Sequence, residues 1–300
     1  MMIFGVRVRK SSRVTLATGL AISLVGIFAP AQAAPTPLLT WSSVTSLKGD
    51  VTIPVGQTVT VAPNSKITLP SGTKITVLGT LLAPQGLTLI GSSWSGLTVI
   101  GSATLTRFNE IGAQTPFRVG TSGILTIHGG AISGILGSSD VEGQLFADGI
   151  TYDKGSGGGI NASNGTGSIT VDRSILKGAG RDTGDFFGLY NAKSITLTNS
   201  QMTGAHCAFH VINLTNMKLD HDSIHGNSYG FMMYGSTDAG VKVITNTSIT
   251  DNLFGFDEGS TSTRNGAISI TGSYIKKNNR DLGLYTGKVK IASPLATKPF

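Results

Sequence analysis

The chain has 300 residues, of which 13% are charged, against about 25% in ordinary soluble domains. Glycine accounts for 41 residues, about twice the usual share of about 7%. A hydrophobic fraction of 39% excludes a wholly disordered chain, and only 10 prolines exclude a collagen-like or proline-rich one. The net charge of +7 arises mainly in residues 1–33, beyond which 19 basic residues stand against 16 acidic ones. Because no dense basic run follows, nucleic acid is not an expected partner.

The first predicted element is a secretory signal peptide over residues 1–33. A basic segment ending at Arg13 precedes an uncharged apolar segment, Val14 to Ala29, and Ala31-Gln32-Ala33 supplies the small residues that a signal peptidase reads. A membrane anchor is the alternative, but the apolar segment is shorter than the roughly 20 residues that a spanning helix needs. We expect cleavage after Ala33, export to the periplasm or the extracellular space, and no membrane contact of the mature protein.

Residues 34–300 are predicted to form one domain, with a core over about 45–287 and a cap at each end. Residues 155–167 are rich in glycine and are interpreted as a loop within this domain. Cys207 is the only cysteine, so no internal disulfide contributes to stability.

A repeat dominates the second half of this domain. Segments starting at Ile169, Ile195, Met217 and Ile268 have apolar residues at their first, third and eighth positions, and one from Val241 fits with one residue of slack. Leu125 to Ile132 is interpreted as an earlier copy. The eighth-position residues follow one another at solenoid spacing: Leu176, Met202, Ile224, Ile249 and Ile275.

A second apolar column follows at a fixed offset from these positions. It contains Phe209, Phe231, Phe256 and Leu282, and Phe187 joins it if residues 178–186 carry an insertion. The residue two positions after each member of this column is also apolar, except at Glu258. Short strands repeated and stacked in this way predict an all-β, single-stranded parallel β-helix of about ten turns. Asn227, Asn252 and Asn278 recur at one bend and predict a ladder of amide hydrogen bonds between turns.

The repeats Ile224 to Phe231 and Ile249 to Phe256 resemble right-handed parallel β-helix repeats of the pectin-lyase-like superfamily. Opening segments such as Gly49 to Pro54 and Ile75 to Leu81 resemble the first turns of secreted β-helix proteins. The resemblance covers roughly residues 45–287 and implies a right-handed coil. It also implies carbohydrate binding or sugar hydrolysis among several functions, because this fold supports many activities.

Three tyrosines are candidate substrate-binding residues. Tyr190, Tyr234 and Tyr285 recur at a position predicted to face solvent, with Ile212 and Gly259 at the same position on other turns. Aromatic faces with a polar tip suit sugar rings. The alternative is that tyrosine is simply a good strand residue.

The insertion carries the candidate catalytic residues. Arg181, Asp182 and Asp185 lie in it, with His210 one turn and Asp257 three turns away. An acid and a base beside a groove could support glycoside cleavage or β-elimination. However, the catalytic motifs of polygalacturonase-like relatives and a calcium-binding carboxylate cluster are absent from the sequence. No cofactor is therefore expected, with calcium as an alternative that no motif supports.

The histidines near Cys207 do not predict a metal site. His206, His210, His221 and His225 are expected to scatter over the coil as solvated residues. His206 is expected to point away from Cys207, which is interpreted as a buried, inert thiol.

The sequence thus favours an exported, non-enzymatic module that binds a polysaccharide or a cell-envelope glycan. A polysaccharide lyase or glycoside hydrolase is the first alternative, in which Asp185→Asn should remove activity. A purely structural or adhesive rod is the second.

Overall fold

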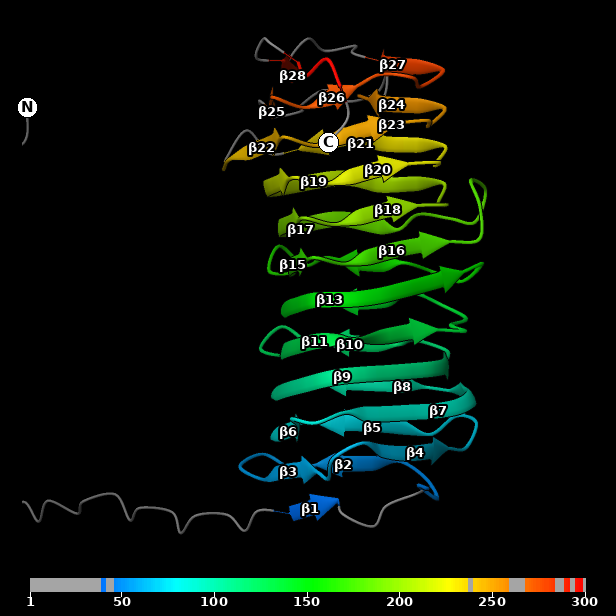
Figure 1. Cartoon of the computed structure of the whole chain (residues 1–300). Coiled ribbons are helices and arrows are strands. Elements are labelled where there is room, and N and C mark those ends of the chain that lie inside the picture. Colours follow the sequence, from blue (N-terminus) through cyan, green and yellow to red (C-terminus); the bar gives the residue numbers. More distant parts are fainter. Residues whose placement is uncertain are drawn as a thin grey trace, which may run out of the picture. The chain divides into compact units, whose positions relative to one another are not determined.

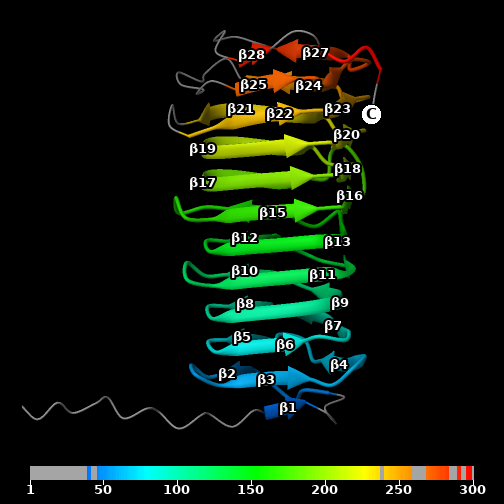
Figure 2. The ribbon, with the colours of Figure 1, turned by 60° about the vertical axis from the view of Figure 1, so that its left-hand side comes forward.

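A computed structural model of the protein describes residues 39–41, 46–236, 240–258, 268–283, 289–291 and 295–298. All of them lie in one compact unit, residues 36–300. They form an all-β parallel solenoid of about ten turns, stacked as Figures 1 and 2 show. The described residues include no helix that is long and apolar enough to cross a membrane.

Each full turn visits three faces, and strands on one face pair in parallel with the next turn. Face 1 contains β2 (Val51–Ile53), β5 (Lys74–Val77), β8 (Gly96–Val99), β10 (Phe117–Val119), β12 (Ser139–Val141), β14 (Ile160–Ala162), the beginnings of β17 (Phe187–Thr198) and β19 (Cys207–Asp220), β21 (Tyr229–Ser236), β24 (Phe254–Asp257) and β27 (Arg280–Gly283).

Face 2 contains β1 (Leu39–Trp41), β3 (Thr58–Val61), β6 (Thr80–Ala83), the beginnings of β9 (Ser102–Ala113), β11 (Ile124–Ser133) and β13 (Gln144–Gly155), then β15 (Ser168–Asp172), the ends of β17 and β19, β22 (Lys242–Thr245), β25 (Ile268–Thr271) and β28 (Val289–Ile291). Face 3 contains β4 (Ser65–Leu69), β7 (Leu87–Trp94), the ends of β9, β11 and β13, then β16 (Ile175–Gly178), β18 (Gln201–Thr203), β20 (Ser223–His225), β23 (Ser248–Thr250) and β26 (Tyr274–Ile275).

The predicted repeat register is confirmed on face 3. Leu176, Met202, Ile224, Ile249 and Ile275 are paired in that order on neighbouring strands, and all are buried. Side chains alternate between the two sides of a strand, so one apolar residue per turn at this position builds a continuous core column.

The predicted aromatic column is confirmed on face 1. Phe187, Phe209, Phe231 and Phe256 follow one another on paired strands, with ring centroids 5.4, 4.7 and 5.2 Å apart. All four rings are buried inside the coil. Stacked rings of this size supply much of the apolar area that holds adjacent turns together.

Two segments differ from the expected register. Residues 155–167 are not one loop, because β14 lies within them with Ile160 and Ala162 buried and Asn161 half-buried between them. In the repeat that starts at Val241, the extra residue comes first. Val241 is exposed, and Lys242 takes the buried position beside Met217. Strand pairing also continues into both predicted caps, through β1 and β28.

The asparagine ladder is present as predicted. The side-chain amide of Asn227 donates to Oδ1 of Asn252 at 3.0 Å, and the amide of Asn252 donates to Oδ1 of Asn278 at 3.0 Å. Oδ1 of Asn227 in turn accepts the backbone N–H of Ala205 at 2.9 Å. The asparagine side chains satisfy buried backbone groups at the bend between faces 3 and 1, where the backbone hydrogen bonds between paired strands are interrupted.

Candidate functional site

Face 1 carries a continuous row of outward positions along the coil. Pairing between successive strands places the following residues in that row: Thr98, Arg118, Asp140, Asn161, Gly188, His210, Met232 and Asp257. Because paired strands lie about 4.8 Å apart, chemically different groups follow one another at a regular step. The row therefore places polar groups on most turns of face 1, with Gly188 and Met232 as its two buried members.

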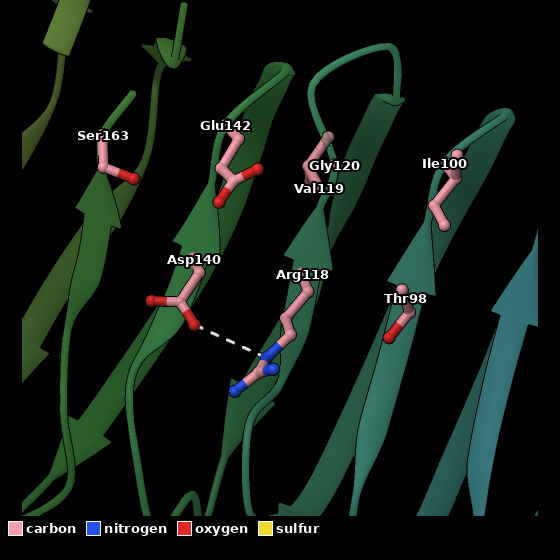
Figure 3. A pocket seen from close by; sticks show the side chains of 8 residues that line it. All are labelled: Thr98, Ile100, Arg118, Val119, Gly120, Asp140, Glu142 and Ser163. Carbon is pink, nitrogen blue, oxygen red and sulfur yellow. Dashed lines mark ion pairs between the residues drawn. The ribbon is translucent and has the colours of Figure 1, made fainter. Parts of the chain in front are cut away.

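In its amino-terminal half the row passes a pocket of about 320 Å³ (Figure 3). Arg118 and Asp140 form an ion pair with 3.5 Å between Nε and Oδ2, and Glu142 lines the same pocket. Asp140 and Glu142 are two residues apart, so both point to the same side of the chain as it leaves β12. A second pocket of about 390 Å³ shares Thr98 and Arg118 and extends to Lys74. The surface near β8 to β14 thus offers one guanidinium and two carboxylates to a polar ligand.

Further along face 1, the insertion lies over the corner before β17. Buried Lys154 donates hydrogen bonds from Nζ to the backbone oxygens of Gly157 and Thr183. Nη2 of Arg181 donates to the backbone oxygen of Asp251 at 2.5 Å, and Oγ of Ser228 donates to the backbone oxygen of Arg181 at 3.1 Å. Contacts to several turns therefore fix residues 179–186, which belong to no strand.

This anchoring places the Asp185 carboxylate between two histidines. Oδ2 of Asp185 lies 2.6 Å from Nδ1 of His210, and Oδ1 lies 3.1 Å from Nδ1 of His206. Burial opposes ionisation of Asp185, but hydrogen bonds from His210, Cys207 and His206 outweigh it and hold the pKa of this carboxyl well below its usual value. Asp185 is therefore an anion at neutral pH.

Cys207 lies beneath the same carboxylate. Its Sγ is 3.3 Å from Nδ1 of His206 and 3.9 Å from Sδ of Met232. Burial and the charge of Asp185 raise the pKa of this thiol, so it is protonated in the unliganded protein. The expectation that His206 points away from Cys207 is wrong, because β19 begins only at Cys207 and side-chain alternation does not apply across its first bond.

The tyrosine positions form a patch beside this cluster. Tyr190 and Tyr234 each make an edge-to-face contact with the His210 ring, at centroid distances of 5.4 and 5.5 Å. The Tyr190 ring lies against Gly188, where an added Cβ would come within 2.6 Å of it. Glycine is thus needed at position 188 for the ring to pack back onto the strand.

The predicted site residues are only partly brought together. Asp185 and His210 are in contact, whereas Asp182 is exposed on the loop and Arg181 points to Asp251. Asp257 lies two strands beyond His210 in the outward row, with Met232 between them. Tyr285 and Gly259 lie outside the described residues.

The expected scatter of histidines is wrong for one pair and right for the other. His206 and His210 share Asp185, as described above. His221 pairs with Asp220, and His225 contacts the side chain of Gln201 on face 3. His206 and His210 are joined through Asp185, which lies on the insertion. The spacing of the two histidines in the sequence therefore does not reveal this contact.

Sequence reasoning missed the pocket residues Arg118, Asp140 and Glu142 and the buried Lys154. The first three lie in turns where the repeat is less regular, so no column of matching residues points to them. The alternation in Asp140-Val141-Glu142, with apolar Val141 between two acids, is a signal that could have found the two carboxylates.

Comparison with known proteins adds no further assignment, since no family model, curated protein or solved structure matches the chain. The geometry of face 1 is therefore the basis for any functional conclusion.

Proposed function

We propose that this chain is an exported protein whose face 1 binds a polysaccharide or a cell-envelope glycan without cleaving it. The proposal includes that the coil is right-handed and that the chain is related to the pectin-lyase-like superfamily. The observation that carries it is the aromatic patch formed by Tyr190, Ile212 and Tyr234, which are 37%, 41% and 39% exposed. On a coil whose other large apolar side chains are mostly buried, such a patch marks a binding surface.

The shape of the patch supports a sugar as the ligand. Tyr190 and Ile212 are paired on adjacent strands, and a register shift after Val211 leaves Tyr234 beside them. Tyrosine combines a flat apolar face with a hydroxyl, which suits the alternation of C–H and O–H groups around a sugar ring. The rings are held in place by His210, so little conformational entropy is lost on binding.

Polar groups on both sides of the patch support an extended ligand. Asp185 and His210 flank the rings, and the side chains of Asn191 and Asn213 form an exposed hydrogen-bonded pair at 2.8 Å. Towards the amino terminus, the outward row continues through Asn161 to the pocket at Arg118. A polymer lying along the row would meet hydrogen-bonding groups on most turns.

The proposal predicts that Tyr190→Ala/Tyr234→Ala lowers the affinity for the cognate glycan at least ten-fold, because two stacking surfaces are lost. The purified chain is screened against neutral and acidic soluble polysaccharides by affinity electrophoresis, and the Kd of each hit is measured by calorimetry. Phe146→Ala is the matched control, because Phe146 is 40% exposed but lies in the part of β13 that belongs to face 2. Unchanged affinity in the double variant, or no binding to any polymer, would contradict the proposal.

A second candidate function is cleavage of the glycan by a lyase or hydrolase mechanism at the pocket of Figure 3. It is favoured by the two carboxylates of Asp140 and Glu142 beside the Arg118 guanidinium. One carboxyl group can act as an acid and the other as a base or nucleophile, while an arginine can neutralise an anionic sugar.

This candidate predicts release of new reducing ends from at least one polysaccharide, with a loss of at least 100-fold in rate in Asp140→Asn or Glu142→Gln. Asp185→Asn serves as the comparison, because it removes the carboxylate that the sequence singled out. Loss of activity only in Asp185→Asn would move the reaction to the His210 cluster. No release from any polymer leaves the non-enzymatic proposal.

A further inference from the structure

Three potential metal ligands, Asp185, Cys207 and His210, come together at the corner before β19, and His206 lies beside two of them. Besides the Asp185 contacts to His206 and His210 at 3.1 and 2.6 Å, Sγ of Cys207 is 3.3 Å from Nδ1 of His206. One donor atom from each of Asp185, Cys207 and His210 lies within 4.8 Å of the other two. In a tetrahedral site with bonds of about 2.0 to 2.3 Å, the donors are roughly 3.3 to 3.8 Å apart. Shifts of about 1 Å or less would bring the donors of Asp185, Cys207 and His210 to such spacings, with His206, in contact with Asp185 and Cys207, as the fourth ligand.

We propose that Asp185, His206, Cys207 and His210 form a binding site for a borderline divalent transition-metal cation such as Zn²⁺. The site goes beyond glycan binding and does not depend on it. Two imidazole nitrogens, one sulfur and one carboxylate oxygen match the ligands that zinc takes in proteins. On binding, the Cys207 thiol loses its proton to solvent, and His206 and His210 change to the neutral tautomer protonated at Nε2. The thiolate, the two Nδ1 lone pairs and the Asp185 carboxylate then coordinate the cation.

The donor set discriminates against hard cations. Mg²⁺ and Ca²⁺ require six or more oxygen ligands, whereas here three of the four donors are nitrogen or sulfur. The sulfur of Met232, 3.9 Å from Sγ of Cys207, makes the surroundings softer still. This chemistry restricts the site to cations of the zinc, cobalt, nickel and copper group.

The surroundings hold the donors in place before any ion arrives. The loop carrying Asp185 is fixed by Lys154 and by the contacts of Arg181 to Asp251 and to Ser228. The His206 ring packs edge-to-face on Tyr229 at 5.3 Å, and the His210 ring lies between Tyr190 and Tyr234. Nδ1 of His210 faces the Asp185 carboxylate at 2.6 Å, whereas Nε2 is buried without a hydrogen-bond partner among the described residues. Such preorganisation favours tight binding.

Cobalt(II) is the probe for this site, because it replaces zinc and reports its ligands by absorption. It is titrated into the untagged, reduced full chain in the absence of any polysaccharide. We expect one equivalent to bind with the visible bands of a tetrahedral site and a near-ultraviolet thiolate charge-transfer band. Zn²⁺ should displace it, and excess Mg²⁺ or Ca²⁺ should not.

Variants of Cys207 and His206 test whether these residues bind the cation. Cys207→Ser should abolish the charge-transfer band, and His206→Gln, at a half-exposed position, should weaken cobalt binding at least ten-fold without unfolding the chain. His225→Gln is the matched control and should bind as wild type does, since His225 contacts Gln201 on another face. The absence of a charge-transfer band in the wild type would overturn the proposal, as would a band unchanged in Cys207→Ser. Because no sugar is present, failure here is distinct from failure of glycan binding.

Discussion

Replacing Glu110 by leucine is expected to raise the stability of the protein by at least about 2 kcal/mol at pH 8. Glu110 is fully buried in β9, where it is paired with Leu89 and Ile132 in a core column on face 3. Neither carboxyl oxygen has a hydrogen-bond partner among the described residues, and burial raises its pKa well above the usual value. Leucine restores the apolar residue that the neighbouring turns have at this position.

The pH dependence of stability shows whether ionisation of the buried Glu110 carboxyl causes this effect. Because the pKa of Glu110 is higher in the folded than in the unfolded state, folding favours its protonated form. The free energy of unfolding is therefore highest below the ordinary glutamate pKa of about 4.3. It falls by about 1.4 kcal/mol per pH unit as the pH rises from there towards the folded-state pKa. Tyr152, the titratable neighbour that senses Glu110, is itself kept neutral by burial over this range.

Thermal and urea unfolding at pH 5 and pH 8 provide the measurement. The difference between wild type and Glu110→Leu should grow with pH. Glu110→Gln, which keeps the shape but cannot ionise, should remove the pH dependence attributable to this residue. Glu142→Gln is the control for loss of a glutamate at the surface pocket and should leave stability unchanged. Equal destabilisation of both Glu110 variants at both pH values would show that Glu110 has a partner that stabilises the fold.

Replacing Asn252 by alanine is expected to destabilise the protein by about 2 to 4 kcal/mol, because four hydrogen bonds end on this one side chain. Its amide donates to Asn278 and to the backbone oxygen of Ile224, and its Oδ1 accepts the backbone N–H and the side-chain amide of Asn227. Asn252 is buried, so water cannot replace the lost partners without opening the bend.

The melting temperature and the urea midpoint measure this effect. Asn279→Ala is the matched control, because Asn279 is in the next turn of the same bend but its side chain is exposed. That variant should stay within about 0.5 kcal/mol of wild type. If Asn252→Ala unfolds at the same temperature as Asn279→Ala, the ladder does not contribute to stability.

The core of the fold was predictable from the sequence because its signal is local and repeated. One apolar residue per turn at the positions of Leu176 and its successors, and one aromatic per turn from Phe187 onwards, set both the strand register and the parallel stacking. The asparagine ladder was predictable for the same reason, since identical side chains recur at one offset from the strand. The register was harder to read where a polar residue takes a core position, as at Lys242 and Glu110.

The candidate sites were predictable only in part. The sequence identified Asp185, His210, Tyr190 and Tyr234 as separate features, one on an insertion and three on strands. It did not reveal that the Asp185 carboxylate joins His206 to His210, because Lys154, Ser228 and Asp251 hold the loop from other turns. Nor did it reveal the pocket of Arg118, Asp140 and Glu142, which is lined by residues from four successive turns.

What the sequence determined by itself was therefore the solenoid, since periodic burial of apolar side chains leaves few other ways to exclude water from them. What only the tertiary structure decided was which polar groups meet on its surface. Their contacts join residues 20 to 70 positions apart, such as Tyr190 with His210 and Arg181 with Asp251, across turns and through an irregular loop. No periodic pattern records such contacts, because each is made once.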